Sequence, residues 1–232
     1  MRVSRLAGVL LVSIATLAQQ SPVVPITSEP SHHLVIENPY VRVFDVTVAP
    51  KASTLVHQHD HDYLFVTLGD SDVISARTGA PPVELKLKDG ETRFTPGNFS
   101  HAAINKSDQP FHNITIELLK PSTHVKSCGD CRPGPPCSSG PCVTIDEPIV
   151  SDQWIVSSVT MRPGAALQNS RPGPVLFVAI SDVDLAGDTK GMQPVKLQSG
   201  KYAWITQWSG ILQNRADQPA RYVTLEFKER TQ

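Results

Sequence analysis

Three histidines, His57, His59 and His101, have the residue type and the spacing of a metal-binding site. His57 and His59 lie two positions apart in a run rich in strand-forming residues, where alternation along a strand points both side chains to one face. His101 ends a stretch that a long hairpin would fold back beside the first. Imidazole suits Zn, Fe, Cu and Ni, and carboxylate shifts the preference toward Mn. We therefore expect one divalent ion, whose identity among these five metals stays open, with coordination positions left for a ligand.

The segment around His101 resembles the second sequence motif of the cupin family, G-x5-P-x-G-x2-H-x3-N. The positions in register are Gly90, Pro96, His101 and Asn105. Asn98 replaces the inner glycine of the motif. The resemblance implies a cupin β-barrel of the double-stranded β-helix or jelly-roll type, with a metal site inside. It says little about the reaction, because one fold can host many functions.

The segment around His57 resembles the first cupin motif, G-x5-H-x-H-x3,4-E-x6-G. It retains His57 and His59 but has Lys51 in place of the leading glycine. Tyr63 occupies the glutamate position in strict register, whereas a one-residue deletion would place Asp62 there. We favour Tyr63, because it shares strand parity with the two histidines.

A three-histidine site without the family's glutamate leaves the charge of a divalent ion uncompensated. Such a site favours an anionic ligand and depresses the pKa of bound water. The candidate catalytic residues are Tyr63, as a fourth ligand or a hydrogen-bond donor to a bound substrate, and His61. His61 has the strand parity to reach the site, to line its rim or to orient a ligating imidazole.

The composition of the 232-residue chain indicates a globular protein with many short strands. Its formal net charge is −1, which gives no electrostatic reason to expect nucleic acid or an anionic membrane surface as a partner. Twenty prolines and 6% aromatic residues favour short strands and turns over long helices. We predict an all-β protein with a core of Val, Ile and Leu.

The N-terminus has the pattern of a secretory signal peptide over residues 1–18. Arg2 and Arg5 precede an apolar stretch, and small residues before Ala18 mark a cleavage site there. About 12 apolar residues are too few to span a bilayer core of about 30 Å. We expect an exported protein, periplasmic or secreted, with no membrane segment after cleavage. Residues 19–35, which include His32 and His33, are expected to form a flexible lead-in.

Two halves of the chain align with an offset of 109 to 113 residues, as in Asn105 to Pro110 beside Asn214 to Pro219. Both copies show short β-runs between turn signals, which predicts two barrels, residues 36–120 and 149–230. The second copy has none of the three histidines, because the equivalent residues are Ser170, Pro172 and Ile211. We therefore expect a structural second barrel, in which Trp204 and Trp208 pack rather than bind a ligand.

A proline-, glycine- and cysteine-rich linker, residues 121–148, joins the two copies. It contains Cys128, Cys131, Cys137 and Cys142. An even number of cysteines in an exported chain favours disulfides over a tetrathiolate zinc site. The sequence leaves the connectivity open.

The resemblance implies two classes of function. In the first, the protein is a metal-dependent enzyme, of dioxygenase or isomerase type, that acts on a small anionic molecule. In the second, it is a cupin that binds a small ligand or a metal without turnover. Neither class fixes the oligomeric state, which we expect to be a monomer or a homodimer.

Overall fold

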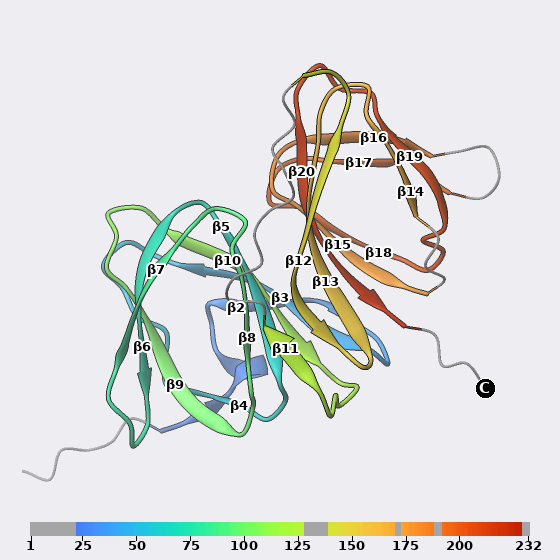
Figure 1. Ribbon diagram of the computed structural model, residues 1–232. Helices are drawn as coiled ribbons and strands as arrows, with labels where there is room; N and C mark the ends of the chain where they lie inside the picture. The colour runs from blue at the N-terminus through green and yellow to red at the C-terminus, as the bar shows by residue number, and fades with distance from the viewer. Residues whose placement is uncertain (1–21, 128–138, 170–172, 188–191, 229–232) are drawn as a thin grey trace, which may run out of the picture.

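The computed structural model describes residues 22–127, 139–169, 173–187 and 192–228, which form β-strands and their connections (Figure 1). The only helix among these residues is a single 3-10 turn, η1 (Ile26–Ser28). No helix of the described part is long and apolar enough to cross a bilayer. The predicted all-β class is therefore confirmed, and the predicted signal peptide lies outside the described residues.

The N-terminal half forms two five-stranded sheets. In order across sheet 1, the strands are β1 (Val24–Pro25), β4 (His57–His59), β9 (Phe99–Asn105), β6 (Ser71–Arg77) and β7 (Val83–Leu87). In order across sheet 2, they are β2 (His32–Glu37), β3 (Val41–Val48), β10 (Phe111–Leu118), β5 (Tyr63–Leu68) and β8 (Thr92–Thr95).

The C-terminal half forms a six-stranded and a four-stranded sheet. In order across sheet 3, the strands are β11 (Val125–Ser127), β12 (Val143–Ser151), β13 (Trp154–Met161), β20 (Ala220–Phe227), β15 (Val175–Ala179) and β18 (Tyr202–Ile205). In order across sheet 4, they are β14 (Ala166–Asn169), β19 (Gly210–Asn214), β16 (Val183–Gly187) and β17 (Val195–Leu197).

The internal repeat of the sequence reappears in the strand order. The run β3-β10-β5-β8 of sheet 2 corresponds to β13-β20-β15-β18 of sheet 3, with each strand number raised by ten. The run β4-β9-β6-β7 of sheet 1 corresponds in the same way to β14-β19-β16-β17 of sheet 4. The two halves of the chain therefore share one topology.

Asn105 and Asn214, which align in the repeat, make the same hydrogen bonds in both copies. The Asn105 amide donates to the carbonyls of Val48 and Gln109, at 3.1 and 2.8 Å. The Asn214 amide donates to Met161 and Gln218, both at 3.0 Å. Each asparagine thus connects the end of one strand to a turn. This structural role does not depend on a metal, which explains why the asparagine is present in a copy without the histidines.

Two departures from the motif glycines lie where the backbone is left-handed. Lys51 has φ 57° and Asn98 has φ 61°, and Gly164, the residue that aligns with Lys51 in the second copy, has φ 74°. Glycine adopts this conformation without the steric cost that a Cβ brings, and asparagine is more tolerant of it than most residues. Lys51 and Asn98 therefore have the backbone conformation expected of the motif glycines that they replace, which supports the alignment with the motifs.

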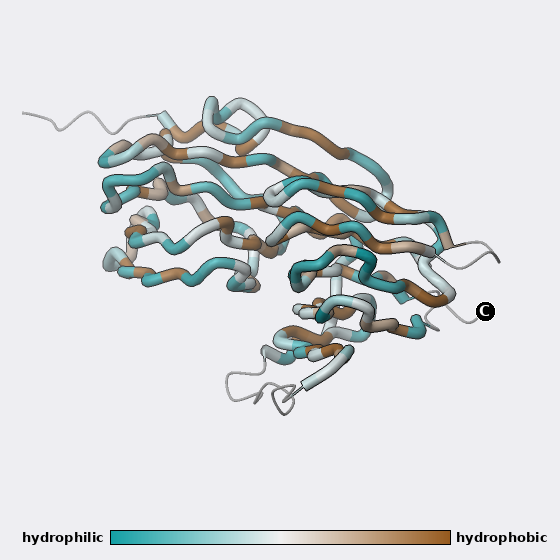
Figure 2. Tube along the Cα trace, turned by 90° about the horizontal axis from the view of Figure 1, so that it is seen from above, coloured by the Kyte–Doolittle hydropathy of each residue, from teal (hydrophilic) through white to brown (hydrophobic). Residues whose placement is uncertain are grey.

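Three apolar clusters hold the sheets together. One lies between sheets 1 and 2, around Phe44, Val73 and Phe111, and a second lies between sheets 3 and 4, around Phe177, Leu185 and Tyr222. The third joins the halves, because strands of sheet 2 and sheet 3 bury their apolar residues against each other. In Figure 2 hydrophilic and hydrophobic residues alternate along many strands. This pattern is expected for sheets that bury one face in a cluster, because successive side chains of a strand point to opposite faces.

Trp204 and Trp208 of the second copy are both packed against other side chains. Trp204 lies against the cluster between the halves, with its ring centroid 5.7 Å from that of Tyr40. Trp208 is buried in the cluster between sheets 3 and 4, and it also lines a small cavity of about 170 Å³. Packing against other side chains is thus the main role of both, as expected.

The expected flexible lead-in over residues 19–35 is wrong for its described part. Residues 24–35 contain β1, η1 and most of β2, because β1 pairs in parallel with β4 and β2 pairs with β3. The linker over residues 121–148 also contains regular structure, since β11 pairs with the end of β12. Cys142 is the one linker cysteine among the described residues, and the other three lie outside them. The expected disulfides therefore stay a prediction.

Candidate metal site and cavity

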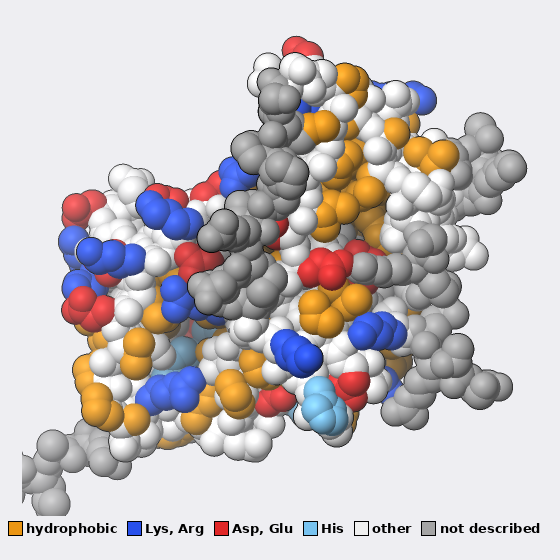
Figure 3. All heavy atoms as spheres, viewed as in Figure 1, with side chains coloured by type: hydrophobic (Ala, Val, Ile, Leu, Met, Phe, Trp, Pro, Cys, Tyr) orange, Lys and Arg blue, Asp and Glu red, His pale blue; other side chains and the backbone are white. Residues whose placement is uncertain are grey.

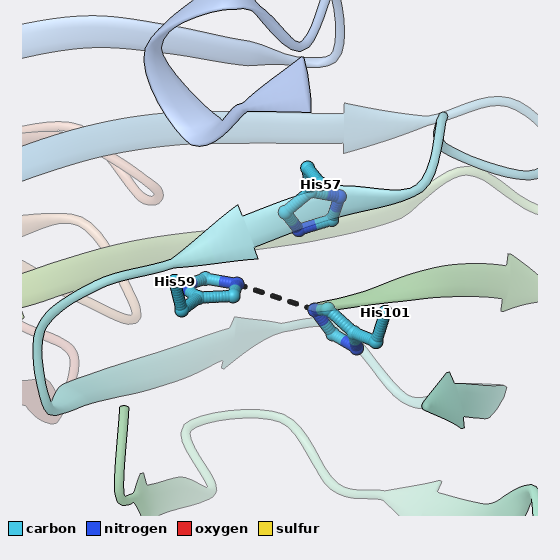
Figure 4. Close-up of side chains that lie close together, drawn as sticks. All are labelled: His57, His59 and His101. Carbon is cyan, nitrogen blue, oxygen red and sulfur yellow. Dashed lines mark hydrogen bonds between the residues drawn. The ribbon is translucent and has the colours of Figure 1, made fainter. Parts of the chain in front are cut away.

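The structure brings the three predicted histidines together on one face of sheet 1 (Figure 4). In the antiparallel pair β4–β9, His57 lies directly opposite His101 and His59 lies opposite Phe99. Strand alternation places His57 and His59 on the same face, as the sequence indicated. One ligand nitrogen from each ring lies within 4.8 Å of the others, and the side chains are buried.

Hydrogen bonds orient two of the three rings. The Nδ1 of His57 lies 3.0 Å from the carbonyl oxygen of Leu55, which can only accept, so Nδ1 carries the proton. The Nδ1 of His101 lies 3.0 Å from the hydroxyl of Ser75 on β6. Metal-bound imidazoles usually hold their second ring nitrogen in this way. In both rings Nε2 is the nitrogen left for an ion.

Aromatic stacking orients the third ring. The ring of Tyr63 lies parallel to that of His59, with 4.1 Å between centroids and 14° between planes. Phe99 stacks on His59 at 5.6 Å and 24°. The Nδ1 of His59 is buried and has no hydrogen-bond partner among the described residues. Contacts of the ring faces, rather than a hydrogen bond at Nδ1, therefore orient this imidazole.

The arrangement fits a divalent ion. The Nε2 atoms of His59 and His101 are 3.2 Å apart. Two nitrogens about 2.0–2.1 Å from a shared ion and about 90–110° apart would be separated by about 2.8–3.4 Å. The Nε2 of His57 is buried without a partner among the described residues. An ion held by the three Nε2 atoms would satisfy this orphaned nitrogen.

Burial keeps the three imidazoles in the neutral form that binds metals. The pKa is about 4 for His57, about 3 for His101 and about 2 for His59, and desolvation is the largest cause of the lowering in each case. Repulsion from neighbouring histidines also contributes at all three rings, and the positive charge of Arg77 contributes at His59 and His101. At neutral pH the site therefore presents three lone pairs and no bound protons that an ion must displace.

The histidines lie in the wall of a cavity of about 590 Å³, a size within the range of small-molecule sites. Figure 3 shows histidine set back in a hollow of the N-terminal half, with hydrophobic and basic side chains around the opening. Apolar side chains from both sheets make up most of the wall, and Arg77 and Arg93 are the two arginines in it. No aspartate or glutamate is among the residues that line it.

Tyr63 and Asp62, the two candidates for the family's glutamate position, point in different directions. Tyr63 lines the cavity, and its hydroxyl is hydrogen-bonded with Thr95. Its contact with the histidines is through the ring. The carboxylate of Asp62 accepts a hydrogen bond of 2.9 Å from the backbone N–H of Gly97, so this side chain stabilises a loop and does not line the cavity.

His61 does not reach the cavity, contrary to the interpretation from strand parity. Strand β4 ends at His59, and residues 60–62 form a bend before β5 begins at Tyr63 in the other sheet. His61 is not among the residues that line the cavity, and its charge acts on the buried Glu117 of β10.

Sequence reasoning missed a fourth buried histidine. His32 lines the cavity, and its ring centroid is 4.6 Å from that of His57. The Nδ1 of His32 lies 2.6 Å from a carboxylate oxygen of Glu29. Burial raises the pKa of Glu29, but hydrogen bonds from His32 and from the backbone N–H groups of Leu55 and Ser31 outweigh it and lower the pKa. No motif marks either residue, because their burial depends on the pairing of β1 and β2 with distant strands.

The second copy offers no equivalent site among its described residues. Ile211 of β19 stands in place of His101 and is exposed, and Ser170 and Pro172 lie outside the described part. The cluster of His57, His59 and His101 is the one candidate metal-binding group found in the described residues.

The fold and the three-histidine cluster together define a cupin-like architecture, and the comparison with solved structures supports it. AerE from Microcystis aeruginosa matches with a TM-score of 0.58 at 11% identity, over 87% of this chain and 99% of that one. A cupin 2 conserved barrel protein from Leptotrichia buccalis matches with a TM-score of 0.53 at 8% identity, over 85% and 88%.

Two of the similar structures are enzymes. Oxalate decarboxylase of Bacillus subtilis, which has Mn(II) centres, matches with a TM-score of 0.56 at 13% identity, over 83% of this chain and 70% of that one. A single-residue mutant of salicylate 1,2-dioxygenase from Pseudoaminobacter salicylatoxidans matches with a TM-score of 0.54 at 13% identity, over 81% and 71%. No family model and no curated protein sequence matches the chain. At these identities the likeness shows the fold alone.

Proposed function

We propose that this protein is an exported cupin with two barrels, of which the first binds one divalent metal through His57, His59 and His101. We propose further that it is a metal-dependent enzyme of dioxygenase or isomerase type that acts on a small anionic molecule. The observation that carries the proposal is the convergence of three buried imidazoles, with a free Nε2 on His57, in the wall of a cavity without carboxylates. Two similar structures, an oxalate decarboxylase with Mn(II) centres and a dioxygenase, support it.

The ion would supply Lewis-acid chemistry at the cavity wall. The chain supplies the surroundings. Leu55 and Ser75 fix the rings of His57 and His101 through their Nδ1 atoms, and Tyr63 and Phe99 hold the ring of His59. The apolar wall around them limits water and strengthens electrostatic interactions with a charged ligand.

The second barrel has a structural role in this proposal. Its sheet 3 covers the outer apolar face of sheet 2, whose other face contributes to the cavity wall. An ion pair of 2.8 Å between Arg221 and Asp89 adds a polar contact between the two halves.

Metal analysis tests the site. The wild-type protein, stripped with a chelator and reloaded with one metal at a time, is expected to bind one equivalent, and His101→Ala is expected to lose it. His124→Ala is the matched control, because His124 is exposed and hydrogen-bonded to the adjacent Thr123. Equal metal content in His101→Ala and the wild type would refute the three-histidine site.

Oxygen consumption separates the enzyme from the alternative, a cupin that binds a ligand or metal without turnover. Iron-loaded protein is assayed with small thiols, diketones and phenols, and His101→Ala is the inactive reference. Uptake of O₂ by the wild type alone supports a dioxygenase. A metal-loaded protein that binds members of the panel without uptake or conversion supports the alternative.

A further inference from the structure

The charges around the cavity are unbalanced. Its wall contains four histidines and two arginines and no carboxylate. Arg93 is already paired, since its Nε lies 2.7 Å from a carboxylate oxygen of Glu91. The guanidinium of Arg77 has no carboxylate partner in the part of the chain that the structure describes. One uncompensated cation therefore remains at the cavity.

The strand register places Arg77 beside the candidate metal site. On β9, His101 is the direct partner of His57 on one side and of Arg77 of β6 on the other. Direct partners in an antiparallel pair point to the same face, with Cβ atoms about 4.5–5.5 Å apart. His57, His101 and Arg77 thus form one row across three strands of sheet 1.

An aromatic contact holds the guanidinium at the opening of the cavity. The Cζ of Arg77 lies 3.9 Å from the ring centroid of Phe99, the same ring that stacks on His59. Arg77 therefore contacts the same aromatic group of Phe99, His59 and Tyr63 that positions the His59 imidazole. This ring contact does not use the guanidinium N–H groups to bind a carboxylate, so within the described residues they can donate to a ligand.

The rest of the wall is apolar. The side chains that dominate it come from both sheets: Val46, Phe65, Val73, Leu85, Leu87 and Phe111. A ligand that satisfies both features needs an anionic group, such as a carboxylate, for the cation and a hydrocarbon body for the wall. A two- or three-carbon acid would leave most of the 590 Å³ unfilled.

We propose that Arg77 binds the carboxylate of an organic acid whose apolar or aromatic body lies in the cavity, with the carboxylate on the side where Arg77 neighbours His101. This inference deepens the proposed function by naming the class of substrate. A guanidinium matches a single carboxylate with two parallel hydrogen bonds, which gives the acid a fixed direction relative to the histidines. Arg77 is then the residue that selects acids over their neutral analogues.

Calorimetric titration of the full-length mature protein, in zinc-loaded and metal-free form, tests the proposal. The probes are 3-phenylpropionate, its neutral analogue 3-phenylpropionamide, and acetate, which lacks the apolar body. We expect 3-phenylpropionate to bind at least tenfold more tightly than the amide and the acetate. Arg77→Gln is expected to weaken binding of the acid about tenfold, or 1.4 kcal/mol, and to leave binding of the amide unchanged.

Arg93→Gln is the matched control, because its guanidinium is paired with Glu91, and it is expected to shift acid and amide binding by the same small factor. Arg77→Lys retains the charge without the planar pair of donors, and an intermediate loss is expected. Arg77 is exposed, so Arg77→Gln should unfold at the wild-type temperature, and this is measured alongside.

The results distinguish this inference from the proposed function. A protein that binds one equivalent of zinc but has the same acid-to-amide ratio in the wild type and Arg77→Gln would overturn the inference and leave the metal site intact. A protein that binds no metal but loses acid selectivity in Arg77→Gln would support the inference and refute the proposed function. Weak binding of 3-phenylpropionate, no tighter than acetate, would overturn the apolar part of the inference.

Discussion

Replacing Tyr63 by leucine should weaken metal binding although Tyr63 is not a ligand. Its ring is the closer of the two that stack on His59, whose Nδ1 has no hydrogen bond to any described residue. An aromatic pair contributes about 0.5–1.5 kcal/mol beyond its buried area. Removing residues that support a ligand typically costs about 10–100-fold in metal affinity. We therefore expect Tyr63→Leu to raise the Kd for zinc about tenfold.

Tyr63→Phe is the matched control. It retains the stacked ring and removes only the hydroxyl that is hydrogen-bonded with Thr95. We expect its zinc affinity to stay within about twofold of the wild type, with a loss of about 1 kcal/mol in the free energy of unfolding. Tyr63→Leu should lose about 2–4 kcal/mol of stability, because the side chain is buried.

The assay is competition for zinc with a chromophoric chelator, at a temperature where all three proteins are folded. The absorption spectrum of cobalt-loaded protein reports in parallel on the geometry of the ligands. Wild-type zinc affinity in Tyr63→Leu would refute the stacking argument. An equal loss in Tyr63→Phe and Tyr63→Leu would show that the hydroxyl, and not the ring, supports the site.

Three further outcomes are expected. His57, His59 and His101 have low pKa values in the folded protein, so acid below about pH 6.5 protonates them in the unfolded chain while the folded chain keeps them neutral down to about pH 4. In this window each histidine should lower the stability of metal-free protein by about 1.4 kcal/mol per pH unit, or about 4 kcal/mol for the three together. Urea unfolding from pH 7 to pH 5 measures this, and a flat profile would contradict it. Gly97→Ala should lower the free energy of unfolding by more than about 2 kcal/mol, because its Cβ would lie 2.4 Å from the backbone carbonyl carbon of His61. Asn98→Gly should leave the free energy of unfolding unchanged or raise it in the same assay, because glycine adopts φ 61° without strain. Mass spectrometry of exported protein should find the mature chain starting after Ala18, and an uncut N-terminus would refute the predicted signal peptide.

The sequence was sufficient for the metal cluster because alternation within one strand and two recognisable motifs together mark its three residues, although β4 and β9 are far apart in the chain. His57 and His59 share a face by alternation within one strand, and the second motif fixes the distance from Gly90 to His101. Tyr63 was placed on the cavity side for an incomplete reason. Parity does not continue from β4, which ends at His59, and Tyr63 reaches the cavity from β5 of the opposite sheet.

What the sequence could not predict depends on long-range pairing. His32 and Arg77 are ordinary polar residues in the chain, and only the pairing of β2 with β3 and of β6 with β9 turns them toward the histidines. His61 is the opposite case: strand alternation in the sequence predicts that it points to the cavity, but β4 ends at His59 and the alternation does not reach His61. Strand ends depend on contacts such as the one between Asp62 and Gly97, which connect residues 35 positions apart.

The burial of sheet 2 against sheet 3 within one polypeptide has a consequence for how the molecule behaves on dilution. Two separate chains that covered each other in this way would come apart at low concentration, because their association is bimolecular. Here the two faces belong to one chain, so each meets the other at an effective concentration in about the millimolar range. This value does not depend on the amount of protein in solution. The cavity wall formed by sheet 2 is therefore supported equally in a crowded compartment and in a very dilute one.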